Sequence, residues 1–201
     1  AMAGWSWQYN IAELNKNFRT YAIDMIGDAG RSQLKDANIY PRDGKELARL
    51  YISIFDSLNV EKADLIGASA GGFAATNIAI FSPERVNRLI LCGPMGYTGT
   101  NLSVLQIVFT TMFPVPPLQN HAFHWAFGDA PHVKEAVREW FNLIVQGVVS
   151  RQVRPVPFTE EQLKSIDIPV LFILGSRDGL VGDPENMKYV TQIIPETELI
   201  I

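Results

Sequence analysis

A serine between two glycines carries the clearest chemical signal in this sequence. The pentapeptide Gly67-Ala68-Ser69-Ala70-Gly71 follows an apolar run at 63–66 and precedes small and apolar residues up to position 81. A G-x-S-x-G pattern between a strand and a helix is typical of a tight turn that presents a nucleophilic serine hydroxyl. Free N–H groups at the start of the helix favour negative charge beside that serine. The sequence therefore predicts that Ser69 is a nucleophile.

A serine nucleophile needs a base, an acid that orients the base, and N–H donors for the oxyanion. Asp178 follows an apolar run at 168–175 and is a candidate for the acid. A turn aspartate that stabilises the corner with Gly179 is the alternative. Asp183 is the reserve acid, although its position before Pro184 also fits the N-cap of a following helix.

The base is harder to place. The sequence has three histidines, His121, His124 and His132. We expect them to pack or to line a pocket rather than to act as the base. Two histidines three residues apart with no adjacent carboxylate are a weak metal signal. Neither a metal nor an organic cofactor is expected.

Aliphatic runs that alternate with helical segments predict an α/β fold with a mostly parallel sheet. The five expected strands lie at 19–24, 63–68, 86–92, 168–175 and 197–201. Such strands are expected to be covered on both faces. Asp43 and Glu46 predict the start of an amphipathic helix that reaches about residue 58, and a second helix is expected over 186–194.

Residues 95–158 interrupt this alternation. No charged residue occurs from Tyr97 to Gly128, and the prolines near 115 leave apolar runs too short for a bilayer span of about 20 residues. We expect helices near 102–113 and 132–148, and a helical cap over a pocket. A membrane-surface or dimer patch is the alternative. The predicted organisation is an α/β core formed by 1–94 and 159–201, with a cap insertion at 95–158.

Composition narrows the classes of partner. The 201 residues are 47% hydrophobic with a net charge of −4, which gives no reason to expect a nucleic acid partner. The single cysteine, Cys92, excludes an intrachain disulfide and is expected to be a packed core thiol. Without a basic and then apolar start to suggest a signal peptide, a cytoplasmic location is expected. A homo-oligomer is possible.

The order of these features resembles the α/β-hydrolase family, in particular its smaller members with a helical cap. The resemblance covers nearly the whole chain. Besides the serine turn, three segments carry it: Asp24 to Ser32, similar to a D-x-x-G-x-G-x-S loop with one extra residue between the glycines; Pro83-Glu84-Arg85-Val86; and the G-x-x-D turn from Gly175 to Asp178.

The resemblance implies roles for particular residues. Ser69 would be the nucleophile, the N–H of Ala70 the first oxyanion donor, and Asp178 the acid. The family's histidine follows the last strand, so we expect it beyond residue 201. The implied activity is a carboxylesterase-like hydrolysis of a small or medium ester with an apolar part. An acyltransferase, a carbon–carbon bond hydrolase and a non-catalytic small-molecule-binding homologue are the alternatives.

The resemblance also implies a strand ahead of residue 1 that ends in an H-G pair and lies between the strands at 19–24 and 63–68. Its absence would leave two rows of backbone groups unpaired in the sheet. We therefore expect a longer chain, a partner that supplies the strand, or direct pairing of the two flanking strands.

Overall fold

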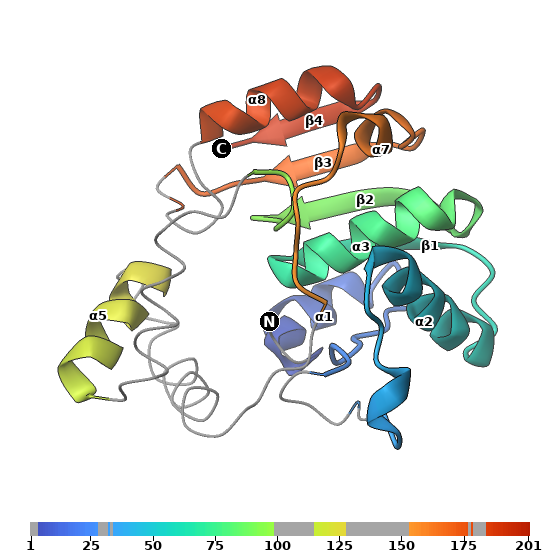
Figure 1. The fold of residues 1–201 in the computed structure, drawn as a ribbon, viewed down its shortest axis with the longest axis horizontal. Helices are drawn as coiled ribbons and strands as arrows, with labels where there is room; N and C mark the ends of the chain where they lie inside the picture. Colours follow the sequence, from blue (N-terminus) through green and yellow to red (C-terminus); the bar gives the residue numbers. More distant parts are fainter. Residues whose placement is uncertain are drawn as a thin grey trace.

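Four of the five predicted strands form one parallel sheet in the computed structural model, which describes residues 4–27, 32, 34–98, 115–127, 153–176, 178 and 184–201. The strands are β1 (Ala63–Ala68), β2 (Val86–Cys92), β3 (Val170–Ile173) and β4 (Thr197–Ile200). They lie side by side in chain order, and each neighbouring pair is parallel (Figure 1). The predicted α/β fold with a mostly parallel sheet is confirmed.

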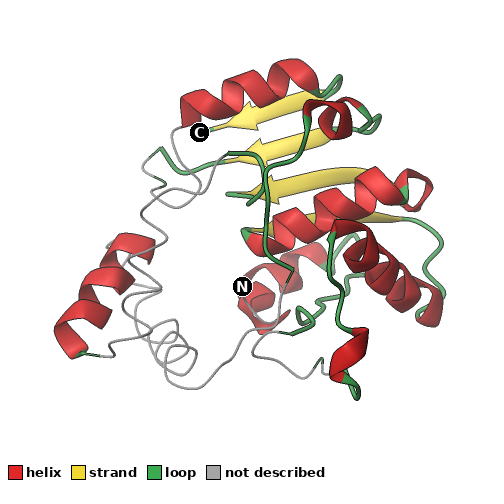
Figure 2. Cartoon of the chain, viewed as in Figure 1, coloured by secondary structure: helices red, strands yellow, loops and turns green. Residues whose placement is uncertain are grey.

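The helices of the described chain connect or flank these strands (Figure 2). They are η1 (Gly4–Trp7), α1 (Gln8–Leu14), η2 (Ala37–Ile39), α2 (Gly44–Ser57), α3 (Ala70–Phe81), η3 (Pro83–Arg85), α5 (Pro116–Phe127), α7 (Glu160–Lys164) and α8 (Pro184–Ile193). α3 packs on β1 and β2, α2 packs on α3, and α8 packs on β4. None of the described helices is long and apolar enough to cross a bilayer.

The two faces of the sheet differ in their cover. Leu91 and Phe172 are fully buried and face the core that α2, α3, α7 and α8 share. On the opposite face, Ile66, Ile173 and Ile200 are 36%, 38% and 48% exposed. The prediction that the strands are covered on both faces is therefore wrong for the described part of the chain, because its core helices gather on one face.

The predicted helix after residue 43 is confirmed as α2. The carboxylate of Asp43 accepts a hydrogen bond from the N–H of Glu46 at 2.8 Å. In a complete capping box, the Glu46 side chain would accept a hydrogen bond from the N–H of Asp43. Here the Glu46 carboxylate accepts instead from the N–H of Arg42, one residue earlier, at 2.9 Å. Tyr51 and Phe55 lie on the buried face of the helix. α8 confirms the second predicted helix.

Three of the described α-helices, α1, α5 and α7, were not predicted from the sequence. α5 begins at two prolines, Pro116 and Pro117, which suit the first turn of a helix because its N–H groups have no intrahelical acceptor. α7 begins with a complete capping box between Thr159 and Gln162. α1 lacks a side-chain cap. The predicted helices near 102–113 and 132–148 lie outside the described residues.

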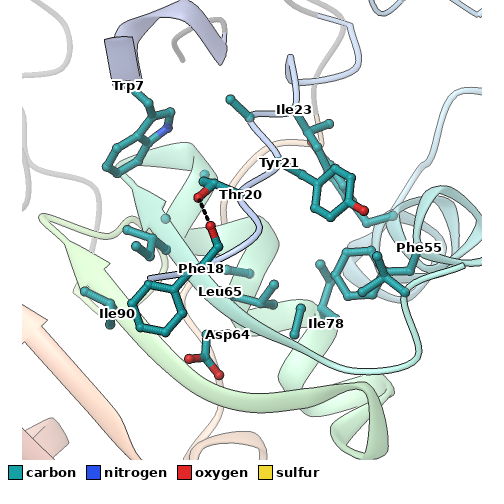
Figure 3. Close-up of a pocket in the computed structure, with 18 of the residues that line it drawn as sticks. Trp7, Phe18, Thr20, Tyr21, Ile23, Phe55, Asp64, Leu65, Ile78 and Ile90 are labelled. Carbon is teal, nitrogen blue, oxygen red and sulfur yellow. Dashed lines mark hydrogen bonds between the residues drawn. The ribbon is translucent and has the colours of Figure 1, made fainter. Parts of the chain in front are cut away.

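The predicted strand at 19–24 is wrong: this segment is irregular. A strand needs a neighbour for its N–H and C=O groups, and this segment is separated from β1 by a cavity of about 800 Å³. Figure 3 shows residues that line this cavity, among them Phe18 and Tyr21 of the first segment, Leu65 of β1 and Ile78 of α3.

The cavity runs along the outer edge of β1, and all six residues of that strand line it. Of the three alternatives for the gap beside β1, direct pairing of the two flanking segments is therefore wrong. The Tyr21 hydroxyl is buried there and has no hydrogen-bond partner among the described residues.

The two ends of the interrupted stretch at 95–158 meet beside the sheet. The N–H of Phe158 donates to the carbonyl of Gly96 at 2.7 Å, and the Phe158 ring stacks on Phe73 of α3 with 5.2 Å between centroids. Gly96 has a φ of 94°, and a β-carbon there would lie 2.7 Å from the Phe158 ring. α5, part of this stretch, stands clear of the sheet (Figure 1).

Candidate active site

Ser69 occupies a strained turn between β1 and α3. Its φ and ψ are 52° and −120°, a region that residues with a β-carbon rarely adopt. Such a conformation costs on the order of 1–3 kcal/mol and persists only where surrounding contacts enforce it. The predicted sharp turn from strand to helix at Ser69 is therefore present.

Backbone hydrogen bonds from both sides enforce this turn. The N–H of Ser69 donates to the carbonyl of Cys92 at 3.0 Å, at the end of the neighbouring strand. The carbonyl of Ser69 accepts from the N–H of Met95 at 3.1 Å and from the N–H of Gly72 at 3.0 Å. The last residue of β2 and the segment that follows it therefore bind both the N–H and the carbonyl of Ser69.

The glycines around Ser69 have different steric roles. A β-carbon at Gly67 would lie 2.6 Å from the carbonyl oxygen of Gly71 and 2.8 Å from the Cα of Gly72. At Gly72 it would lie 2.6 Å from the β-carbon of Pro94. At Gly71 it would meet no atom within 4 Å among the described residues. Gly67 and Gly72 are therefore the positions where the absence of a β-carbon permits close approach of the chain, whereas Gly71 is not such a position.

Gly67→Ala is expected to destabilise the protein by about 3 kcal/mol, because the new methyl group meets backbone atoms that cannot rotate away. Urea unfolding of the intact protein measures the change in the free energy of unfolding. Gly175→Ala is the matched control, since a β-carbon there would have its nearest neighbour among the described residues at 3.9 Å. Equal free energies of unfolding for the two variants would contradict the close approach described above.

Ser69 and Asp178 line the same cavity, of about 460 Å³, at the carboxyl ends of the strands. The remaining lining residues come from the ends of β1, β2 and β3 and from the turn after β3: Ala68, Cys92, Gly93, Ile173, Leu174 and Gly175. The N–H of Gly93 donates to the carbonyl of Ile173 at 3.0 Å and joins two of these ends. Ligands of open parallel sheets bind in the crevice outside this edge.

Asp178 reaches the cavity through a short turn. Its N–H donates to the carbonyl of Gly175 at 3.1 Å, and the residue is half-buried. The predicted nucleophile and the favoured acid are thus brought together, although 109 positions separate them in the sequence (178 minus 69). The reserve acid, Asp183, lies outside the described residues.

Ala70 is the first residue of α3 and is buried at the base of the turn. Its N–H has no acceptor within the helix, as for every residue of a first helical turn. This N–H is the one that the sequence nominates as an oxyanion donor.

The described histidines lie elsewhere. His121 and His124 are exposed on α5, and neither lines the cavity of Ser69. Because both side chains are exposed, the expectation that they pack in the core is wrong for His121 and His124. His132 lies outside the described residues. Within the described ranges, no three His, Cys, Asp or Glu side chains gather as possible metal ligands.

Cys92 is only half-buried and lines the cavity beside Ser69, so the expectation of a packed core thiol is wrong. The sequence did not predict this position, because the end of a strand does not indicate whether a cavity lies beside it. Partial burial raises the pKa of the Cys92 thiol. The thiol is therefore neutral near neutral pH and can contribute apolar surface to the cavity.

This pKa shift predicts how the thiol reacts. Because the thiolate is the reactive form, iodoacetamide is expected to modify Cys92 more slowly than free cysteine at a pH of about 7.5. The rate should still be rising above a pH of about 9, which mass spectrometry of samples quenched at intervals can follow. A rate that levels off below a pH of about 8 would contradict the raised pKa.

Comparisons with known proteins agree with this arrangement. Residues 7–199 match the family model described as serine aminopeptidase, S33. The carboxylesterase YbfK of Bacillus subtilis is 28% identical over 94% of this chain, and the chain spans 65% of that relative's length. A 2-hydroxy-6-oxo-2,4-heptadienoate hydrolase of Pseudomonas putida is 30% identical over 96% of this chain and 73% of its own length.

A solved structure shares the fold closely. The naproxen esterase of Bacillus subtilis, carboxylesterase NP, superposes with a TM-score of 0.87 at 25% identity, over 99% of this chain and 71% of the esterase chain. The chain therefore belongs to the α/β-hydrolase family described as serine aminopeptidase, S33.

Proposed function

We propose that this protein is a serine hydrolase that cleaves a small or medium carboxylic ester with an apolar part. One observation carries the proposal: Ser69 is held in a strained turn at a cavity that Asp178 also lines. A strained serine at such an edge exposes its hydroxyl to a ligand. The carboxylesterases among the relatives support an ester as substrate.

In this proposal, Ser69 Oγ attacks the ester carbonyl carbon while its proton passes to a histidine. The N–H of Ala70 donates to the oxyanion, and the alcohol leaves with the proton that the histidine returns. Water then hydrolyses the acyl-serine by the same route. Asp178 orients the histidine and stabilises its charged form. The histidine lies outside the described residues, as the family's chain order Ser, Asp, His implies.

We further propose that residues 95–158 form a cap that covers the site. The uncharged stretch from Tyr97 to Gly128 supports this role, because an apolar cover suits an apolar acyl or alcohol group. The hydrogen bond between Gly96 and Phe158 also supports it, since the stretch leaves and rejoins the core at one place.

Hydrolysis of a carbon–carbon bond is the second candidate. It is supported by the 2-hydroxy-6-oxo-2,4-heptadienoate hydrolase, which matches this chain over most of both lengths. Parallel assays with p-nitrophenyl butyrate and with a 2-hydroxy-6-oxo-dienoate separate the two. Faster turnover of the dienoate would favour the second candidate.

A fluorophosphonate probe tests the shared part of the proposal. The intact protein is expected to form a covalent adduct, and peptide mapping should place it on Ser69. Labelling should fail in Ser69→Ala. A folded wild-type sample that remains unlabelled would contradict the proposal and favour a non-catalytic binding protein.

A further inference from the structure

Tyr97 makes a buried hydrogen bond to the helix that begins after Ser69. The side chain is 8% exposed, and its hydroxyl lies 2.8 Å from the hydroxyl of Thr76, which is fully buried. Thr76 donates to the carbonyl of Gly72 at 2.8 Å, so the proton between the two hydroxyls belongs to Tyr97. Burial raises the pKa of Tyr97, which keeps this donor protonated.

The ring of Tyr97 contacts two further parts of the chain. It packs edge-on against Phe172 of β3, with 5.0 Å between centroids, and against Phe158, with 5.2 Å. β3 leads to the turn of Asp178, and Phe158 is where the stretch 95–158 rejoins the core. Tyr97 therefore joins the helix of the nucleophile, the strand of the acid and the base of the proposed cap.

The chain between Cys92 and Tyr97 holds the turn of Ser69 in place. The carbonyl of Cys92 accepts a hydrogen bond from the N–H of Ser69, and the N–H of Met95 donates to the carbonyl of Ser69. Pro94 lies against Gly72, one turn before Thr76 on the same helix. Tyr97 is the last residue of this connection, residues 93–97. Its hydrogen bond to Thr76 therefore fixes the end of the connection on α3.

We propose that Tyr97 is a positioning residue for Ser69, which acts through the hydrogen bond to Thr76 and the backbone contact of Met95. This inference rests on the proposed role of Ser69 as nucleophile. The role of Tyr97 is indirect, because Tyr97 is not among the described residues that line the cavity of Ser69. Its hydroxyl limits how far the segment after β2 can move from the strained turn. The loss of one such hydrogen bond is expected to slow reaction at Ser69 by about tenfold.

Tyr97→Phe in the intact protein tests this, because phenylalanine keeps the ring contacts and removes only the hydroxyl. Fluorophosphonate labelling measured over a range of probe concentrations separates reversible binding from the maximal rate of bond formation. We expect the maximal rate to fall about tenfold while the binding constant stays unchanged. Thr76→Val should have the same effect, and Thr76→Ser, which keeps a hydroxyl, should restore most of the rate.

The double variant Tyr97→Phe/Thr76→Val distinguishes a shared bond from two separate effects. If the bond is shared, the double variant loses no more than the larger of the two single losses. Tyr51→Phe is the matched control, since Tyr51 is similarly buried but lies on α2. Its thermal stability can fall, but its maximal labelling rate should equal that of the wild type.

The outcomes separate this inference from the proposed function. A folded wild type that resists labelling contradicts the role of Ser69 itself. A wild type that is labelled on Ser69, with Tyr97→Phe labelled at the same maximal rate, overturns only the positioning role. Equal losses of rate in Tyr97→Phe and Tyr51→Phe would also overturn it, because general loosening of the core would then explain both.

Discussion

Ser69→Ala is expected to lower kcat for ester hydrolysis at least about 10⁴-fold, the largest effect of any single substitution in this chain. The variant loses the attacking oxygen but keeps a β-carbon, so the strain of the turn and the fold are expected to be unchanged. Initial rates with p-nitrophenyl butyrate and a thermal melt of the same samples measure the two quantities. KM is expected to change little, because the hydroxyl adds little to ground-state binding.

Ser57→Ala provides the control for this experiment. Ser57 is exposed on α2, where its hydroxyl donates to the carbonyl of Ser53 at 2.8 Å. Wild-type kcat is expected in this variant. If Ser69→Ala retained more than about a tenth of the wild-type kcat, another group would have to be the nucleophile.

Asp178→Asn is expected to lower kcat by about 10³- to 10⁴-fold. The amide is close in size to the carboxylate, so the turn with Gly175 should persist. It cannot stabilise a positively charged histidine, however, and it can hold the ring in the wrong tautomer. Initial rates with the same ester and a fluorophosphonate labelling rate both report the loss.

Asp183→Asn is the matched comparison, since this residue is the reserve acid. Near wild-type activity is expected there. A large loss in Asp183→Asn together with a small loss in Asp178→Asn would transfer the role of the acid to Asp183. A small loss in both would contradict a triad that uses either carboxylate.

Local features of the sequence were the most predictable part of this protein. The turn at Ser69 depends on residues within five positions of one another, and the start of α2 depends on Asp43 and Glu46. Each of these patterns has a local physical cause: close backbone approach or a capped helix end. Such features depend little on how the rest of the chain folds.

Among features that depend on distant segments, the parallel sheet and the meeting of Ser69 and Asp178 were predicted, but the finer contacts were not. The segment 19–24 has the composition of a strand, yet strand pairing needs a neighbour, and a cavity separates it from β1. Gly72 rather than Gly71 permits close approach because Pro94, 22 positions later, lies against it. Likewise, Tyr97 belongs to an apolar stretch whose sequence gives no sign of the contact with Thr76.

A crystal structure of the intact protein after reaction with the fluorophosphonate would show whether Ser69 is the nucleophile beside Asp178. We expect a phosphorus atom bonded to Ser69 Oγ, a positive φ at that residue, and Asp178 on the same side of the sheet edge within reach of one intervening histidine. An adduct on any other side chain, or an Asp178 carboxylate turned away from the cavity that holds the phosphonate, would contradict it.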